Sequence, residues 1–289
     1  MKIIDILRQD KLHLSCELFP PKQGTQLANV DRLVAEIAAL RPSYISVTYG
    51  ASGGTSAHTV DIADMIQNRF GVPALAHLTC ASSTREHVAS VIGQLKAAGI
   101  ENILALRGDI PEDLPFPRPD QYRYACELTA QIRASGDFCI GGACYPEGHP
   151  EAPDIRTDVE HLRYKLDAGC DFLTTQMFFD NHLYYQFLLR LRGAGIDVPV
   201  VPGIMPVTNG KQIKRAMALS GNMLPPKFRA IVEKYSDDPA AMEQAGIAYA
   251  TEQIVDLAAN GVNSIHIYTM NKPRVARRIF ENLSELIGK

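Results

Sequence analysis

The chain has 289 residues, of which 46% are hydrophobic and 21% charged, so it can bury a large core. Its net charge of −3, with both signs mixed, gives no basic field for nucleic acid and no acidic tail. No apolar run approaches the roughly 18 residues of a membrane span, and Asp5, Arg8 and Asp10 interrupt the first residues, so no signal-peptide core is expected.

The six cysteines contain no C-x-x-C pair, and several lie inside apolar runs, where cysteine usually behaves as a small buried hydrophobe. This usage is typical of reduced thiols rather than of a disulfide framework. We therefore expect a cytoplasmic protein.

The chain alternates between short apolar segments and segments with the helical spacing of apolar residues. In chain order, the sequence predicts a lead-in helix at 1–13, a strand at 14–19, a helix at 26–40, a strand at 44–49, a helix at 57–70, a strand at 74–79, a helix at about 83–99, a strand at 104–109, a loop at 110–123, a helix at 124–135, a strand at 139–145, a helix at 158–168, a strand at 172–178, a helix at 182–194, a strand at 198–204, a helix beginning near 210, one or two helices within 222–262, a strand at 264–268 and a closing helix at 274–287.

Two kinds of local signal mark the helix ends. Ser83 and Glu86 have the spacing of a capping box, in which the two side chains satisfy free amides at a helix start. A glycine stands just after four of the predicted helices and just before the next strand, as expected of a left-handed helix cap. These glycines are Gly99, Gly169, Gly195 and Gly261.

Eight strand–helix units with short connections predict a parallel sheet. Eight such units in fewer than 300 residues favour a closed (β/α)8 TIM barrel, which needs about 250 residues, with an extra helix or two before the last strand. We expect one domain over residues 1–289. An open, doubly wound sheet is the competing topology, and it would be favoured by a G-x-G-x-x-G after the first strand, which the sequence lacks.

In a (β/α)8 barrel the active site lies at the carboxyl ends of the strands. Each polar side chain predicted there has a structural explanation by itself, as a satisfied histidine or a core tyrosine, but together they converge on one end of the barrel. They are Glu17, Thr48, Tyr49, His77, Thr79, Arg107, Asp109, Tyr145, His149, Gln176 and Tyr268.

Glu17 stands between Cys16 and Leu18, where an unpaired carboxylate is costly to bury. A desolvated carboxyl tends to keep its proton, which suits a general acid. His77 and His149 lack the close spacing of paired metal ligands, so we expect no metal site. The sequence also lacks the nucleophile elbow of a hydrolase.

Seven segments, met in one order over nearly the whole chain, resemble the motifs of methylenetetrahydrofolate reductases. They are Cys16-Glu17-Leu18-Phe19-Pro20-Pro21-Lys22, Ser46-Val47-Thr48-Tyr49-Gly50-Ala51, Ala76-His77-Leu78-Thr79-Cys80, Ala105-Leu106-Arg107-Gly108-Asp109, Tyr145-Pro146-Glu147-Gly148-His149-Pro150-Glu151, Lys165-Leu166-Asp167-Ala168-Gly169 with Thr175-Gln176-Met177-Phe178-Phe179-Asp180, and Val201-Pro202-Gly203-Ile204-Met205-Pro206-Val207.

The resemblance implies a barrel that binds FAD at its strand ends and uses one flavin face in turn for NADH or NADPH and for methylenetetrahydrofolate. Carried over by position, Glu17 is the catalytic acid and Asp109 the second catalytic residue, while Glu17, Asp109, Gln176, Gln212 and Lys272 contact the substrate. The implied FAD residues are Thr48, Tyr49, Ala51, His77, Arg107, Gly108, Asp109, Tyr124, Ala125, Tyr145, His149, Ala152, Asp158, His161, Tyr164 and Lys165.

The sequence departs from the family pattern at three positions. His161 and Tyr164 stand where bacterial relatives are expected to have Asn and Arg, near the adenosine and phosphate end of FAD. Ala216 stands where an aromatic ring helps to stack the bound ligand in a relative. The animal enzymes carry a regulatory domain after the barrel, and this sequence ends after the barrel, so inhibition by S-adenosylmethionine is not implied.

Three alternatives stay open at this point. The same barrel could be a folate-reducing subunit that receives electrons from a partner protein, which the Ala216 departure makes conceivable. A pterin barrel without flavin, such as a folate-dependent methyltransferase, is a second alternative. A phosphate-binding aldolase or isomerase is a third, although no glycine-rich phosphate loop follows the last strands. We further expect a homo-oligomer with no nucleic acid or membrane partner.

Overall fold

The structure, a computed structural model, describes residues 1–20, 27–49, 56–110, 115–210, 213, 217 and 224–288. Within them, nine parallel strand segments form one sheet in the order β7-β6-β5-β4-β3-β2-β1-β9-β8. The segments are β1 (His13–Leu18), β2 (Ile45–Val47), β3 (Ala74–Thr79), β4 (Asn102–Leu106), β5 (Cys139–Cys144), β6 (Phe172–Thr175), β7 (Val200–Val201), β8 (Gly203–Ile204) and β9 (Ser264–Tyr268).

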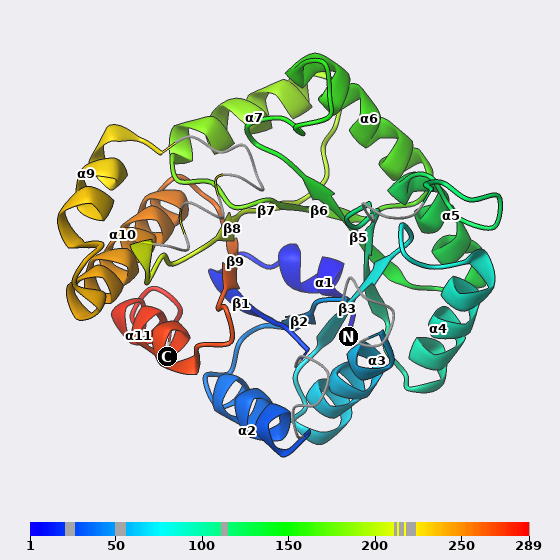
Figure 1. Cartoon of the computed structure of the whole chain (residues 1–289), viewed down its shortest axis with the longest axis horizontal. Helices are drawn as coiled ribbons and strands as arrows, with labels where there is room; N and C mark the ends of the chain where they lie inside the picture. The colour runs from blue at the N-terminus through cyan, green and yellow to red at the C-terminus, as the bar shows by residue number, and fades with distance from the viewer. Residues whose placement is uncertain are drawn as a thin grey trace.

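Helices surround this ring of strands (Figure 1). The surrounding helices are α2 (Leu27–Ala38), α3 (Ser56–Asp64) with the π-helical turn η1 (Met65–Arg69), α4 (Arg85–Ala97), α5 (Ala125–Ser135), α6 (Ile155–Asp167), α7 (Asn181–Gly193), α9 (Pro226–Tyr235), α10 (Pro239–Ala259) and α11 (Pro273–Asn282). The short helix α1 (Ile3–Leu7) lies inside the ring instead (Figure 1). Gly210, Ile213 and Met217 are also helical, where a helix was predicted to begin near residue 210.

The barrel closes where β7 and β8 meet. β7 pairs with β6 and β8 pairs with β9, and only Pro202 separates β7 from β8. Proline has no backbone N–H to give to a ladder, which interrupts the strand, but the Pro202 carbonyl still accepts from His266 N at 2.9 Å. The nine segments are therefore eight strands of a closed (β/α)8 barrel, and the predicted fold class is confirmed.

Successive side chains of each strand point to opposite faces, so the core has two layers, one outside the ring of strands and one inside it. The largest set of buried apolar side chains lies between the strands and the surrounding helices, with Val34, Val88 and Leu128 among its members. A smaller set lies within the ring, where Ile3 and Leu7 of α1 pack against Tyr44 and Phe172. Figure 1 shows α1 inside the ring, so this short helix fills one end of the barrel.

Most of the predicted helices and strands are present, but several begin or end at other residues than predicted. The strand predicted over 104–109 is β4, which ends at Leu106, because Gly108 turns the chain with a φ of +81°. The strand predicted over 172–178 ends at Thr175. The lead-in helix predicted over 1–13 stops at Leu7, since His13 already pairs with Ser264 as the first residue of β1. The helices α9 and α10 lie within residues 222–262, before the last strand, where one or two helices were predicted.

The predicted capping box at Ser83 and Glu86 is wrong by one residue. Thr84 is the cap of α4, and its Oγ1 accepts from His87 N at 3.1 Å, while Ser83 is buried before the helix. The four glycine caps are confirmed, with φ values of +71°, +107°, +71° and +82° at Gly99, Gly169, Gly195 and Gly261. All six cysteines are free thiols, five of them buried.

In the part of the chain that the structure describes, we find no helix that combines the length and apolarity needed to span a membrane.

Candidate functional site

Glu17 lies inside the barrel near the carboxyl end of β1. Register places it beside Ser46 of β2 and Tyr268 of β9, and the residue is 6% exposed. Among the described residues no donor makes a hydrogen bond to its carboxyl, so burial raises the pKa of Glu17 to about 8. A carboxyl with such a pKa holds its proton at neutral pH, as the sequence predicted.

Two buried histidines face this carboxyl. His77 Nε2 on β3 lies 3.7 Å from Glu17 Oε2, and His266 Nε2 on β9 lies 4.0 Å from the same atom. Burial lowers the pKa of both imidazoles to about 3, and His77 adds to the effect on His266. Both rings are therefore neutral, and neither contact is an ion pair at neutral pH.

The hydrogen bonds of His266 assign its tautomer. Ser15 Oγ donates to Ile265 O at 3.1 Å, so its only proton is used, and at 2.7 Å it must accept from His266 Nδ1. Nε2 then carries a lone pair and accepts from Ser46 Oγ at 3.0 Å. The ring also stacks on Tyr44, with centroids 5.6 Å apart. Two hydrogen bonds and one stacked ring thus fix the orientation of the neutral His266 imidazole beside Glu17.

A second cluster surrounds Arg107, just beyond β4. Tyr145, after β5, interacts electrostatically with Arg107, Asp158 and Asp109, and burial raises the pKa of its hydroxyl. His149 interacts with Arg107, Asp158 and Lys165, its N donates to Asp158 Oδ2 at 3.1 Å, and its ring meets the Tyr145 ring edge-on at 4.6 Å. The structure therefore brings together six of the predicted residues from β4, β5 and α6. They are Arg107, Asp109, Tyr145, His149, Asp158 and Lys165.

Two features of this cluster suit an anionic cofactor. Lys165 Nζ donates to Ala143 O at 2.6 Å, and within the described residues no carboxylate pairs with it, so burial lowers the pKa of this ammonium. Gly108 has a positive φ, and a Cβ there would lie 2.9 Å from Thr79 Cβ, so only glycine fits. A cation that pairs with no described carboxylate and a glycine turn that admits no side chain are both features of sites that bind phosphate oxygens.

Other predicted residues lie around these clusters. Thr48 is half-buried after β2, and the Tyr49 hydroxyl contacts His87 Nε2 of α4 at 3.1 Å, so the Tyr49 ring belongs to the core. Gln176 follows β6, and its Oε1 accepts from Met177 N at 2.9 Å. Lys272 Nζ contacts Thr208 Oγ1 at 2.6 Å.

The predicted residues toward the outside are less closely gathered. Tyr124 is 49% exposed below the Arg123 guanidinium, and Ala125 is buried. His161 and Tyr164 stack on each other along α6 with centroids 6.0 Å apart, and Tyr164 is 61% exposed. Ala152 is half-buried in the loop before α6. Ala51, Gln212 and Ala216 lie outside the described residues.

Sequence reasoning missed two members of the site. His266 alternates with Ile265 and Ile267 in β9, and this period of two should have placed it inside the barrel. Glu151 was part of a recognised motif, but its role shows only in the fold, where both carboxylate oxygens accept from Arg107 at 2.6 Å. No periodicity could have predicted that pair.

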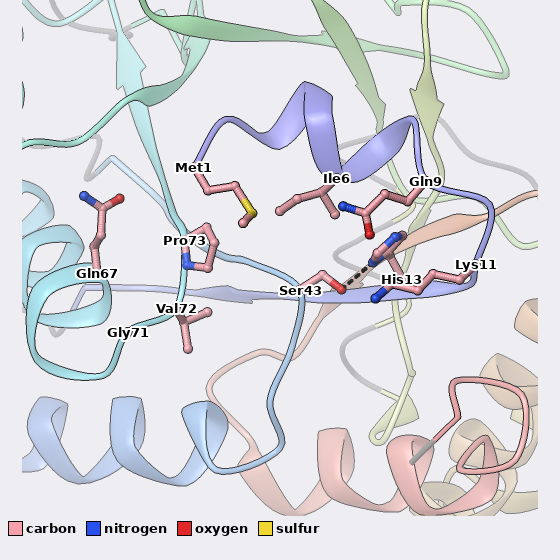
Figure 2. A pocket seen from close by; sticks show the side chains of 10 residues that line it. All are labelled: Met1, Ile6, Gln9, Lys11, His13, Ser43, Gln67, Gly71, Val72 and Pro73. Atoms are coloured by element: carbon pink, nitrogen blue, oxygen red, sulfur yellow. Dashed lines mark hydrogen bonds between the residues drawn. The ribbon is translucent and has the colours of Figure 1, made fainter.

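A separate pocket of about 390 Å³ lies at the other end of the barrel. Figure 2 shows its lining side chains, which come from α1 and from the segments that lead into β1, β2 and β3. His13 Nδ1 and Ser43 Oγ are hydrogen bonded there at 2.9 Å. Of the predicted site residues that the structure describes, none lines this pocket. Among the described residues, no group of three or more His, Cys, Asp or Glu side chains could hold a metal ion.

Comparison with known sequences gives a consistent result. Residues 2–284 match the family described as methylenetetrahydrofolate reductase. A 5,10-methylenetetrahydrofolate reductase of Pectobacterium carotovorum is 35% identical, with 95% of this chain and 91% of that protein covered. The enzyme of the same name from Escherichia coli is 34% identical over 95% of this chain and 92% of its own. Methylenetetrahydrofolate reductase (NADH) 1 of Arabidopsis thaliana is 34% identical over 98% of this chain and 51% of its own.

Solved structures share the fold. An uncharacterized protein from Clostridium thermocellum that binds two copies of 5-methyl-5,6,7,8-tetrahydrofolic acid superposes with a TM-score of 0.61 at 13% identity, covering 98% of both chains. Oxaloacetate acetylhydrolase superposes with a TM-score of 0.54 at 13% identity, covering 100% of this chain and 87% of its own. At such identity these likenesses support the barrel fold alone.

Proposed function

Because the chain belongs to the methylenetetrahydrofolate reductase family of oxidoreductases, we propose that it reduces 5,10-methylenetetrahydrofolate to 5-methyltetrahydrofolate with FAD and NAD(P)H. The observation that carries the chemistry is the Glu17 carboxyl, which is buried at the strand ends with a pKa raised to about 8. Reduction of this substrate requires a proton donor for a ring nitrogen, and Glu17 is a buried group that keeps a proton at neutral pH.

FAD would supply the hydride-transfer chemistry, and the residues of the barrel would bind and orient it. Arg107 and Lys165 would neutralise its diphosphate, because both cations lie in one cluster at the ends of β4, β5 and α6. Gly108 would let the cofactor approach the backbone. The other proposed contacts are Thr48, Tyr49, Ala51, His77, Asp109, Tyr124, Ala125, Tyr145, His149, Ala152, Asp158, His161 and Tyr164.

Glu17 would protonate N10 of the bound folate, which opens the five-membered ring and leaves an iminium cation at N5. Asp109, exposed just after the Gly108 turn, would stabilise this cation electrostatically. Gln176 offers its amide NH₂ and its second carbonyl lone pair to the amide edge of the pterin. Lys272 and Gln212 are proposed as further substrate contacts.

The neutral histidines support this assignment of the acid. A cationic imidazole 3.7–4.0 Å from Glu17 would favour the ionised carboxylate and remove the proton that the reaction needs. Because burial lowers the pKa of His77 and His266 to about 3, both rings leave the Glu17 carboxyl protonated. The two buried imidazoles thus lie near the acid without competing for its proton.

We further propose a ping-pong sequence in which NAD(P)H is oxidised and leaves before folate binds at the same flavin face. The plant relative named for NADH favours NADH as the donor. Delivery of electrons by a partner protein is the alternative that the experiment below separates from direct use of a nicotinamide.

The test begins with the visible spectrum of the purified chain. We expect flavin absorbance bands, bleaching by NADH or NADPH under argon, and reappearance of the bands on addition of methylenetetrahydrofolate, with 5-methyltetrahydrofolate as product. Reduced ferredoxin is assayed in parallel. A colourless protein that binds no added FAD would contradict the proposal and favour a pterin barrel without flavin. Bleaching by ferredoxin alone would favour the partner-dependent alternative.

A further inference from the structure

Arg107 and Glu151 form a bidentate ion pair at the rim of the candidate cofactor site. Arg107 Nη1 and Nη2 donate to Glu151 Oε2 and Oε1, both at 2.6 Å. The two side chains are 22% and 57% exposed, so solvent reaches the carboxylate more than the guanidinium. The pair raises the pKa of Arg107 and lowers that of Glu151, so both stay charged.

The backbone of Glu151 is held in place by the loop between β5 and α6. Glu151 N donates to His149 Nδ1 at 3.1 Å, and His149 N donates to Asp158 Oδ2 of α6 at 3.1 Å. Gly148, with a φ of +89°, starts this turn. The carboxylate is therefore presented to Arg107 from a fixed loop, while its exposed side chain is able to rotate away.

The two N–H groups that Arg107 gives to Glu151 are those with which a guanidinium binds a phosphate in the bidentate mode. The same two N–H groups cannot donate to the Glu151 carboxylate and to a phosphate at the same time. Lys165, by contrast, lies in the same cluster and is bound only to the Ala143 carbonyl among the described residues. Of the two cations that we propose for the diphosphate, one is thus already occupied by the chain's own carboxylate.

We propose that Glu151 is a built-in competitor for the diphosphate of a dinucleotide cofactor. It occupies Arg107 when the phosphate is absent and moves into solvent when the phosphate binds. This inference rests on the proposed function, because it assumes that FAD binds at this cluster. Since an exposed ion pair stabilises little, we expect Glu151 to weaken FAD binding by about 3–10-fold.

The experiment measures the dissociation constant of FAD for the flavin-stripped full chain by quenching of flavin fluorescence. We expect Glu151→Gln to bind FAD about 3–10-fold more tightly than the wild type and to release it more slowly. Glu160→Gln is the matched control, because Glu160 is 58% exposed and pairs with Arg156 on the outer face of α6. Its FAD affinity should not change.

A double-mutant cycle identifies the cause. Removing Glu151 should tighten binding only while Arg107 is present, so Arg107→Gln and Arg107→Gln/Glu151→Gln should bind FAD equally. If wild type binds FAD but Glu151→Gln binds it no better, the inference is wrong and the proposed function stands. If wild type binds no FAD, the proposed function fails as well. Thermal unfolding of each variant shows that it is folded.

Discussion

At the scale of single residues, Glu17 has an environment that few carboxyls in proteins share. It is 6% exposed, with two neutral imidazoles and the Tyr268 ring as its polar neighbours on β3 and β9. Burial without a donor makes ionisation costly. Its chemistry therefore depends on the surrounding strands rather than on any neighbour in the chain.

The variant Glu17→Gln keeps the shape of the side chain but has no acidic proton. We expect normal flavin content and normal reduction by the donor, with folate reduction slower by roughly 10²–10⁴-fold, the usual effect of a positioned acid. Rapid-mixing absorbance measurements of the two half-reactions check this. Near-normal production of 5-methyltetrahydrofolate would remove Glu17 from its proposed role.

Stability of the protein should also depend on the Glu17 proton. The folded-state pKa is raised from 4.5 to about 8, so between these values the folded state binds a proton that the unfolded state has released. Stability from this group therefore falls as pH rises from about 4.5 to 8 and then stays level. Relative to wild type, Glu17→Gln should gain stability on the order of a few kcal/mol between pH 5 and pH 8. Urea unfolding at several pH values measures it, and a difference that is constant with pH would contradict it.

Asp109 is exposed beyond the Gly108 turn, where its charge does not support the core. We expect Asp109→Asn to slow folate reduction by about 10–10³-fold, because the variant cannot stabilise the iminium cation by charge. Its unfolding midpoint should match that of wild type within error. Unchanged rates in both half-reactions would show that Asp109 has no catalytic role.

At the scale of elements, helix α10 approaches the barrel closely at Gly246. A Cβ at this position would lie 1.8 Å from Val207 O, just after β8. Thr208, the residue after Val207, contacts Lys272 Nζ. The absence of a side chain at Gly246 therefore determines how α10 and the end of the barrel fit together.

We expect Gly246→Ala to destabilise the protein by at least about 2 kcal/mol, because backbone must move to admit the methyl group. Gly93→Ala is the control, since Gly93 is exposed within α4 and a Cβ there meets nothing within 4 Å. That change should stabilise by about 0.5–1 kcal/mol through helix propensity alone. Thermal or urea unfolding compares the two, and equal effects would contradict the close approach.

At the scale of the whole molecule, α1 closes the inside of the barrel at the end opposite the candidate site. Ile3 N donates to Asn102 Oδ1 at 2.8 Å, and the Asn102 amide also bonds Met1 O and Ala74 O. Ile3 is fully buried against residues from several strands. The helix thus connects the N-terminal segment to strands that are distant in sequence.

We expect Ile3→Ala to lower the free energy of unfolding by about 2–4 kcal/mol, as for other truncations of fully buried isoleucines. Ile4→Ala, one residue along on the partly exposed face, should cost less than half as much. FAD content should be unaffected in both variants, because the residues proposed to bind FAD lie at the other end of the strands. Equal losses of stability in the two variants would contradict the role of α1 inside the barrel.

The sequence alone determined the barrel, because each strand–helix unit carries its own local signals. Apolar periodicity and the caps at Gly99, Gly169, Gly195 and Gly261 depend only on neighbouring residues. The rule that active sites lie at the carboxyl ends of barrel strands then predicted, from the sequence alone, that Glu17, Arg107 and Asp109 lie at one end of the barrel. Boundaries were less well predicted, as at Leu106, because a positive φ at Gly108 rather than hydrophobicity ends that strand.

Only the tertiary structure decided which groups meet and in which protonation state. His77 and His266 lie 60 and 249 residues from Glu17 along the chain, yet both approach its carboxyl within 4.0 Å. Glu151, in the loop after β5, reaches Arg107 at the end of the neighbouring strand β4. Desolvation and such contacts between distant segments depend on three-dimensional packing, which periodicity along one chain does not encode.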